Sequence, residues 1–215
     1  MKSILVIGLG HFGKHIITKL NELNCQVMAV DVDEERVNSV LSMVDSAQIG
    51  DAANPEFLAG LGVSNFDTCI VTIGDDFQSS LETASQLKEF GAKHVVSRAS
   101  SDIQEKFLLR NGADEVVYPE KQLAAWTCIR CTSEYVFDYI DLGSDQSIFE
   151  VSVPPEWVGK TILQLNVRKQ YGLNILGVRE NGKLNTLISP DTVFKAGTTV
   201  LVLGEQKRIQ KYFKI

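Results

Sequence analysis

The residues with the clearest chemical potential are three glycines and one aspartate in the first part of the chain. The run Gly8-Leu9-Gly10-His11-Phe12-Gly13 has the spacing GxGxxG, and Asp31 follows 18 residues after Gly13. In such a turn the glycines permit a tight bend, close approach of phosphate to the backbone, and close packing of a helix on a strand. An acid at about that distance accepts hydrogen bonds from ribose hydroxyls and would repel a 2′-phosphate. The spacing therefore predicts a site for NAD or an adenosine phosphate rather than NADP.

The neighbouring sequence supplies the elements that such a site needs. A strand is expected at Ser3–Ile7 and a helix from the glycine run to about Leu23, so the helix N-terminus would present unpaired N–H groups to an anion. The strand that follows ends at Asp31, while Asp33 is better explained as the cap of a helix through Val44 than as a ligand contact. The glycines thus lie between the first strand and the helix, and the acid lies at the end of the second strand, as a dinucleotide-binding motif requires.

Beyond this unit, short β-branched runs alternate with segments of helical length. Strands are expected at Ser3–Ile7, Gln26–Asp31, Ala47–Gly50, Thr68–Thr72, Val95–Ser97 and Glu115–Tyr118. Asn54 with Pro55, and Ser101 with Gln104 as a capping box, mark helix starts between them. The alternation predicts an α/β fold, a Rossmann-like parallel sheet with helices on both faces.

The rhythm changes in the last third of the chain. A longer helix is expected over Lys121–Tyr139, and after Ser144 short strands follow at Ser147–Val153, Asn174–Arg179 and Thr199–Leu203. We therefore expect three segments: a nucleotide-binding domain at residues 1–120, a linker or crossover helix at 121–143, and a smaller α+β lobe at 144–215.

Composition limits the possible functions. The net charge of −6 argues against a nucleic-acid binder. The charge is divided unevenly, because residues up to Gly143 carry 11 basic and 21 acidic side chains and those from Ser144 onward carry 10 and 6. We expect Lys207, Arg208, Lys211 and Lys214 to form a solvated helix face. No run is long and apolar enough for a membrane span and no secretory signal is evident, so a cytoplasmic protein with reduced cysteines is expected.

An enzyme is the rival interpretation, namely a small NAD-dependent oxidoreductase. Such an enzyme needs a positioned acid–base group near the nicotinamide. The three histidines, His11, His15 and His94, are each better explained by their positions in the phosphate loop, the first helix and the start of a strand. Cys128 and Cys131 have the CxxC spacing, but two helix-borne cysteines are favoured over a redox or zinc motif. We predict no catalytic residue. A vestigial site in an interaction protein is disfavoured by the intact glycines and Asp31.

Further motifs along the whole chain carry a family resemblance. They are Val6–Gly13, Ala29–Glu35, Ile49–Ala52, Val71–Gly74, Gly112–Asp114, Tyr118–Lys121, Leu165–Arg168 and Tyr171-Gly172. With these motifs the chain resembles the RCK, or KTN, regulatory subunits of the Trk and Ktr potassium transporters (TrkA/KtrA-like).

The resemblance implies a non-enzymatic regulatory subunit that gates a potassium transporter or channel. Such subunits bind ATP, ADP or NAD, form dimers that assemble into an octameric ring, and sit under an integral membrane potassium-translocating subunit at the inner face of the membrane. ADP, ATP, AMP or NAD/NADH is then the expected ligand. The predicted ligand-contacting residues are Gly8, Leu9, Gly10, His11, Phe12, Gly13, Asp31, Val32, Asp51, Ala52, Ile73, Gly74 and Arg98.

The resemblance also implies secondary sites and one departure. Glu120 matches a position that can help hold Mg or Ca near the nucleotide, although a plain helix N-terminal acid is the favoured interpretation. Asn166, Arg168, Asn174 and Ile175 match a cyclic di-AMP pocket, the alternative being that they shape a turn and a strand start. Ktr-type relatives commonly carry arginine where this chain has His11. A shorter side chain without permanent charge weakens the case for an ATP-specific response.

Overall fold

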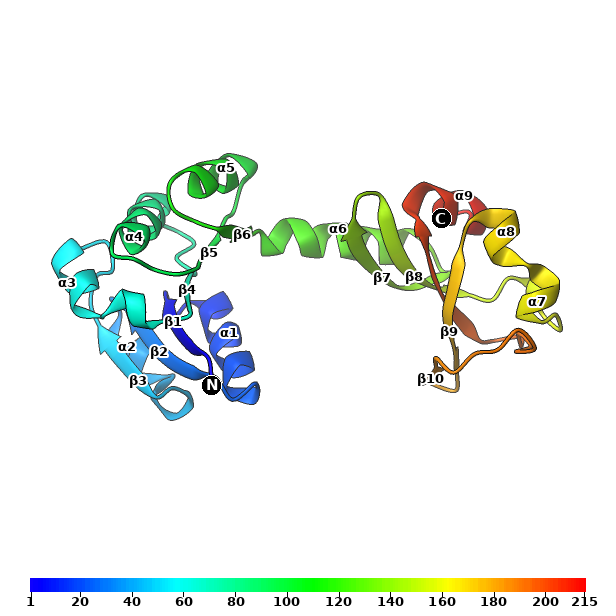
Figure 1. Ribbon diagram of the computed structural model, residues 1–215, viewed down its shortest axis with the longest axis horizontal. Coiled ribbons are helices and arrows are strands. Elements are labelled where there is room, and N and C mark those ends of the chain that lie inside the picture. Colours follow the sequence, from blue (N-terminus) through cyan, green and yellow to red (C-terminus); the bar gives the residue numbers. More distant parts are fainter. The chain divides into compact units, whose positions relative to one another are not determined.

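The computed structural model describes residues 1–131 and 133–215 in full, and residue 132 only as a position in a helix. The chain divides into two compact units, Met1–Glu120 and Lys121–Ile215 (Figure 1). Within the described residues, no helix has the length and apolar character needed to cross a lipid bilayer.

The first unit is a six-stranded parallel sheet with strand order β3-β2-β1-β4-β5-β6 (Figure 1). Its strands are β1 (Ser3–Ile7), β2 (Gln26–Asp31), β3 (Ser46–Ile49), β4 (Thr68–Val71), β5 (Val95–Arg98) and β6 (Glu115–Val117). Its helices are α1 (His11–Glu22), α2 (Glu34–Asn38), α3 (Pro55–Gly60), α4 (Phe77–Glu89) and α5 (Asp102–Arg110), with short 3-10 turns η1 (Leu41–Met43) and η2 (Val63–Asn65). All five strand pairings are parallel, which confirms the Rossmann-like fold.

Helices cover both faces of this sheet because β1 is apolar on both sides. Leu5 and Ile7 pack into one core with residues of α3, α4 and α5, whereas Ile4 and Val6 pack into a second core with residues of α1 and α2. Near-continuous burial of a strand is typical of the centre of a parallel sheet. The loops that follow β1 and β4 are thereby held at one edge.

Three aspartates hold the opposite edge of the sheet in the same way. Each precedes a strand and accepts a backbone N–H from the first or second residue of the neighbouring strand: Asp45 from Val27 over 2.7 Å, Asp67 from Ser3 over 2.9 Å, and Asp114 from Val95 over 2.7 Å. N–H groups at a strand start lack a ladder partner, so these carboxylates satisfy donors that the sheet leaves open. The strand register is therefore supported at the end remote from the glycine loop.

The expected helix starts occur where the sequence places them, with two corrections. Asn54 and Asp33 both accept backbone N–H bonds as N-caps, and Pro55 is the first residue of α3. The helix from Asp33, however, ends at Asn38 instead of Val44, and a 3-10 turn follows. The capping box at Ser101 is only half formed, because the Gln104 side chain accepts from Ser100.

The second unit is an antiparallel sheet with strand order β10-β9-β11-β8-β7. Its strands are β7 (Val136–Gly143), β8 (Gln146–Ser152), β9 (Asn174–Glu180), β10 (Lys183–Asn185) and β11 (Thr199–Glu205). Helix α6 (Pro119–Thr132) leads into it, and the turn η3 (Pro155–Trp157) and helices α7 (Ile162–Leu165), α8 (Val167–Tyr171) and α9 (Gln206–Phe213) complete it. The smaller α+β lobe is thus present, with more strand than the sequence predicted.

The expectation of a helix through Tyr139, and of a linker helix to residue 143, is wrong. Helix α6 ends at Thr132, and Val136–Gly143 forms a strand paired with β8. Val136 and Tyr139 are buried three residues apart, a spacing that fits a helix face, but a register shift in β7 brings both to the core side of the sheet. Pairing with a later strand decided this element, and local periodicity could not show it.

The turn at Ser144 and Asp145 joins two strands and does not separate two domains. Both residues have positive φ, +52° and +59°, as a two-residue hairpin turn of type I′ requires. Asn181 and Gly182, with φ of +50° and +77°, form a second such turn before the unpredicted strand β10. The antiparallel sheet therefore begins before residue 144.

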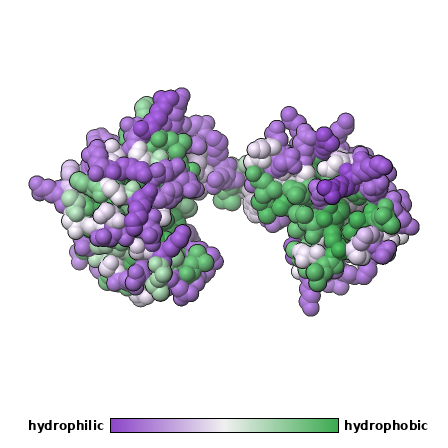
Figure 2. Space-filling model, in the orientation of Figure 1, coloured by the Kyte–Doolittle hydropathy of each residue, from purple (hydrophilic) through white to green (hydrophobic). Residues whose placement is uncertain are grey.

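The two faces of this second sheet differ. Trp157 and residues of α8 and α9 pack against buried Phe149 and Val202. The strand neighbours Ile140, Ile148 and Leu203 alternate with these buried positions and are exposed or half-buried. Hydrophobic residues gather over a broad area of this unit in Figure 2. Extended apolar surface of this kind marks an interaction site more often than a solvated one. The basic residues expected on the last helix are solvent-exposed.

Candidate functional site

A cavity of the first unit lies at the carboxyl ends of β1 and β4, where the strand order reverses. Its volume is about 960 Å³. Ligands in open parallel sheets bind at this switch point. The predicted site residues that line it are Gly8, Gly10, His11, Phe12, Asp31, Val32, Asp51, Ala52, Ile73, Gly74, Arg98 and Glu120. The tertiary structure thus gathers residues from five strand ends and two helix starts.

Glycine is required for a different physical reason at each of the three positions of the loop. Gly8 has φ of +95°, a conformation that side chains rarely adopt. A Cβ on Gly13 would lie 2.1 Å from the carbonyl oxygen of Gly8, so only glycine allows α1 to approach the loop. A Cβ on Gly10 would meet nothing within 4 Å. The backbone at Gly10 is therefore left open toward the cavity, where a ligand could approach it.

Asp31 is held in place by the backbone that it faces. Its side chain accepts a hydrogen bond from the N–H of Leu9 over 2.6 Å and another from the N–H of Asp33 over 2.9 Å. The residue is only 5 % exposed, and the guanidinium of Arg36 lies 3.8 Å away. The carboxylate thus fixes the glycine loop while its remaining lone pairs stay available at the cavity.

Leu9 and Gly13 do not line the cavity, although both were predicted to contact a ligand. The Leu9 side chain is buried in the core beneath α1, and Gly13 is buried against Gly8. Leu9 contributes through its backbone N–H, which Asp31 already occupies. In this structure both residues support the loop, and their contact with a ligand stays a prediction.

Arg98 is neither exposed nor isolated. Its side chain is 21 % exposed, is paired with the carboxylate of Glu120, and lies 5.9 Å from the centre of the Phe12 ring. A Cβ on Gly74 would stand 2.0 Å from Nη1 of Arg98, so glycine at that position gives the guanidinium its room. Nε of Arg98 is buried without a hydrogen-bond partner. The arginine therefore retains donor capacity beside the cavity.

Glu120 is occupied by this ion pair. The pKa of its carboxyl is lowered, first by a hydrogen bond from its own backbone N–H and then by Arg98. No group of three or more His, Cys, Asp or Glu within the described residues is arranged to hold a metal ion. A Mg or Ca ion at Glu120 therefore stays a prediction that follows from the resemblance alone.

Several cavity residues were not identified from the sequence. They are Ile7, His15, Val30, Arg36, Gly50, Thr72, Asp75, Asp76 and Ser79. The Thr72 hydroxyl lies within hydrogen-bonding distance of the carbonyl oxygens of Ile7 and Gly8, so it anchors the glycine loop to β4. Ile7 is the last residue of β1 and Thr72 directly follows β4. Their positions at the ends of expected strands could have identified them as cavity residues from the sequence. His15 and Arg36 each follow a predicted site residue, His11 and Val32, by four residues. This spacing could have identified them from the sequence.

The four residues predicted for a second ligand lie in the second unit at a helix–helix junction and a strand start. Asn166 has φ of +44° and separates α7 from α8. Asn174 and Ile175 begin β9, and Arg168 is exposed on α8. A hollow of about 490 Å³ in this unit lies beside Trp157 and Tyr212, and none of the four residues lines it. The conformation of Asn166 matches the turn-shaping alternative.

Comparison with known proteins assigns one domain family to each of the two units. Residues 4–119 match the TrkA-N domain family and residues 147–215 match the TrkA-C domain family. The chain is 35% identical over 215 residues to the Ktr system potassium uptake protein C of Bacillus subtilis, covering 99% of this chain and 96% of that protein. It is 33% identical over 211 residues to the Ktr system potassium uptake protein A of the same organism, covering 98% and 95%.

A solved structure shares the fold. The GsuK channel bound to NAD superposes with a TM-score of 0.71 at 21% identity, over 99% of this chain and 39% of the channel chain. This chain therefore spans about two-fifths of that channel's length. The paired domain matches and the similarity to two potassium uptake proteins over nearly the full length show that the chain belongs to the RCK family of Ktr-type potassium uptake proteins, built from a TrkA-N and a TrkA-C domain.

Proposed function

We propose that this chain is the nucleotide-binding regulatory subunit of a potassium uptake system. It binds an adenine nucleotide in the cavity of the first unit and catalyses no reaction on it. Occupancy of that cavity changes the conformation that the chain presents to an integral membrane subunit, which carries the ion.

The observation that carries this proposal is the arrangement around the Gly8–Gly13 loop. The loop faces a cavity at the switch point of a parallel sheet, Gly10 leaves room for a phosphate, and Asp31 is fixed at the end of β2. Each of these features favours a ribose and a phosphate bound to the same edge. A cavity volume of about 960 Å³ is within the usual range for such ligands.

ADP, AMP and NAD are favoured over ATP as ligands. His11, without a permanent charge, is the first residue of α1, and the Arg98 guanidinium is shared with Glu120. The terminal phosphate of ATP would thus meet less fixed positive charge than an arginine at position 11 would provide. The GsuK channel, which shares the fold, has been solved with NAD. Asp31 disfavours a 2′-phosphate, although Arg36 beside it tempers this effect.

A regulatory role also fits the position of Glu120. The residue belongs to the first turn of α6, the helix through which the chain leaves the first unit. A phosphate that draws Arg98 away would release this carboxylate. Ligand binding is thereby linked to the start of the connecting helix, and two states of that contact give the free-energy difference that regulation requires.

Self-association and membrane partnership are part of the proposal. We expect dimers, assembled into an octameric ring, at the inner face of the membrane beneath the partner subunit. The apolar surface of the second unit, which includes exposed Phe137, Ile140 and Leu142, provides area for such contacts. We further propose that cyclic di-AMP binds at Asn166 and Arg168, because the positive charge of this part of the chain favours an anionic ligand.

Calorimetric titration of nucleotide-stripped protein with ATP, ADP, AMP, NADH and cyclic di-AMP tests the proposal, together with the mass in solution. Micromolar binding of an adenine nucleotide by an oligomer, with no turnover, is expected. Gly10→Ala should weaken this binding roughly tenfold, whereas Gly60→Ala is the matched control because neither Cβ meets a neighbour within 4 Å. Absence of binding, or steady oxidation of NADH with a small carbonyl compound, contradicts the proposal; the latter result favours the oxidoreductase.

A further inference from the structure

We propose that His11 and His15 form a two-ligand site for a transition-metal ion of the Zn²⁺ class, which also binds the phosphates of the nucleotide. The inference rests on the proposed function, because the nucleotide supplies further oxygen ligands. It concerns a cation and side chains different from the Mg or Ca site that the family resemblance implies at Glu120.

The first observation is the spacing and exposure of the two imidazoles. His11 is the first residue of α1, and His15 is four residues later on the same helix. Residues at this spacing share a helix face, with Cβ atoms about 6 Å apart, as in helix-borne zinc ligands. Both residues are exposed and both line the nucleotide cavity.

Neither imidazole has another role in the described part of the chain. No hydrogen bond or ion pair of His11 or His15 is present among the described residues. His94, by contrast, lies 3.7 Å from Asp114 and 3.7 Å from Glu115. The first two histidines can therefore bind a metal ion without breaking a contact that supports the fold.

The second observation is the charge of the cavity. Its lining carries five carboxylates, Asp31, Asp51, Asp75, Asp76 and Glu120, and two guanidinium groups, Arg36 and Arg98. Both arginines are already close to carboxylates, Arg36 to Asp31 and Asp33, and Arg98 to Glu120. Phosphates would add negative charge to a cavity that is already acidic. A bound divalent cation is the largest local charge available to offset it, and neutral imidazoles can hold one.

Ligand chemistry selects the class of metal. Imidazole nitrogen suits Zn, Co, Ni and Cu, whereas Mg and Ca prefer oxygen. Two protein ligands leave at least two positions of a tetrahedral Zn²⁺ ion open. Since no third His, Cys, Asp or Glu joins in a metal-binding group within the described residues, phosphate oxygens and water must complete the coordination. Metal and nucleotide should therefore bind cooperatively.

The experiment uses the full chain carrying Cys128→Ser and Cys131→Ser, because these two exposed thiols lie outside disulfides and would also bind a soft metal. Zn²⁺ is first added without nucleotide, and long-range ¹H–¹⁵N spectra of the imidazoles are recorded. The chain has only three histidines, so the signals can be assigned by substitution. ADP is then titrated calorimetrically without metal, with Mg²⁺ and with Zn²⁺.

Zn²⁺ should shift the His11 and His15 signals but not those of His94, and should raise the affinity for ADP roughly tenfold above both other conditions. The ratio of ADP affinity with Zn²⁺ to ADP affinity without metal, measured for each variant, should fall to about one in His15→Gln and stay at roughly tenfold in the control His94→Gln. An increase that survives in His15→Gln, or ADP binding that ignores Zn²⁺, overturns the metal site and leaves the proposed function standing. If no nucleotide binds under any condition, the proposed function fails, and unshifted His11 and His15 signals then reject the metal site independently.

Discussion

The carboxylate of Asp31 accepts the backbone N–H of Leu9 over 2.6 Å, so the acid at the end of β2 holds the loop that follows β1. A residue predicted to bind ribose is thus also a support of the phosphate loop. Any substitution of Asp31 must alter both the ligand site and the folded state, and the two effects need separate measurements.

Asp31→Asn should destabilise the first unit as well as weaken nucleotide binding. Asparagine has one acceptor oxygen, whereas two backbone N–H groups, those of Leu9 and Asp33, each point at a carboxylate oxygen. One buried donor would be left unpaired, at a cost of about 1–3 kcal/mol. Denaturant unfolding with hydrogen exchange of β1 and α1 measures the cost. Asp33→Asn is the control, since asparagine is an equally good N-cap and stability should change little. Equal stability of both variants would contradict the assignment.

The glycines of the loop should separate into a structural and a functional one. Gly13→Ala places a Cβ 2.1 Å from a backbone oxygen, and overpacking of this kind costs about 1–3 kcal/mol or more. Gly10→Ala meets nothing and should leave thermal stability unchanged while weakening ADP binding roughly tenfold, because a phosphate would contact the methyl group. Melting curves and calorimetry on both variants decide the matter. A stable Gly13→Ala protein, or normal ADP affinity in Gly10→Ala, refutes the division of roles.

The carboxylate of Glu120 and a phosphate of the nucleotide should compete for the guanidinium of Arg98. Glu120→Gln weakens this pair and should raise the affinity for ADP roughly two- to fivefold, the range expected for a partly exposed ion pair. Arg98→Gln removes a charged donor and should lower it roughly tenfold or more. Glu56→Gln, an exposed acid in the first turn of α3, is the matched control. Reduced ADP affinity in Glu120→Gln would show that this carboxylate assists the ligand directly.

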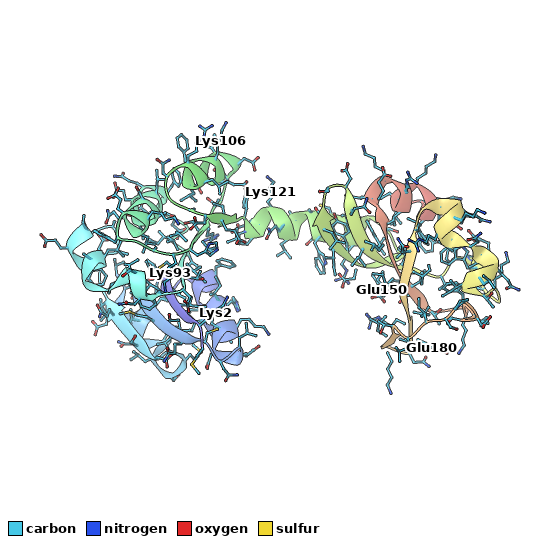
Figure 3. The ribbon with its side chains drawn as sticks, viewed as in Figure 1. Lys2, Lys93, Lys106, Lys121, Glu150 and Glu180 are labelled. Carbon is cyan, nitrogen blue, oxygen red and sulfur yellow. The ribbon has the colours of Figure 1, made fainter. Side chains whose placement is uncertain are left out.

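The second unit should lose stability in acid partly through Glu150, which lies within its sheet (Figure 3). Burial acts to raise the pKa of this carboxyl, but hydrogen bonds from Arg179 and Thr199 outweigh it, and the pKa is lowered. Because the pKa is lower in the folded state, ionised Glu150 contributes fully to stability above the unfolded-state pKa of about 4.3. This stabilisation is lost as the pH falls through the folded-state pKa.

Glu150→Gln should therefore lower the stability at neutral pH by about 1–2 kcal/mol and flatten its decline below about pH 4. Both tryptophans, Trp126 and Trp157, belong to the second unit, so their fluorescence follows its unfolding alone. Glu180→Gln is the control, because Glu180, at the end of β9, pairs with Lys195 and both side chains are exposed. An unchanged acid slope in Glu150→Gln would contradict the role of this carboxyl.

Local pattern was sufficient to predict the first sheet. Its strands were found within about one residue because each is a short run that contains β-branched residues and is bounded by turn residues, as at Ser3–Ile7 and Gln26–Asp31. The helix starts at Asp33 and Asn54 depend on side chains that bond backbone two or three residues away. Interactions of that range can be inferred from sequence, and so could the glycine loop, Asp31 and the family resemblance.

Only the tertiary structure decided the features that depend on distant residues. Val136–Gly143 is a strand because β8 pairs with it, and Leu9 packs its side chain in the core while Asp31 accepts its N–H. Strand ends far apart in sequence meet at one edge, and this brings Thr72 to the glycine loop and Arg98 to Phe12. Contacts of this kind form after loops close and elements pack, so no short window of sequence contains them.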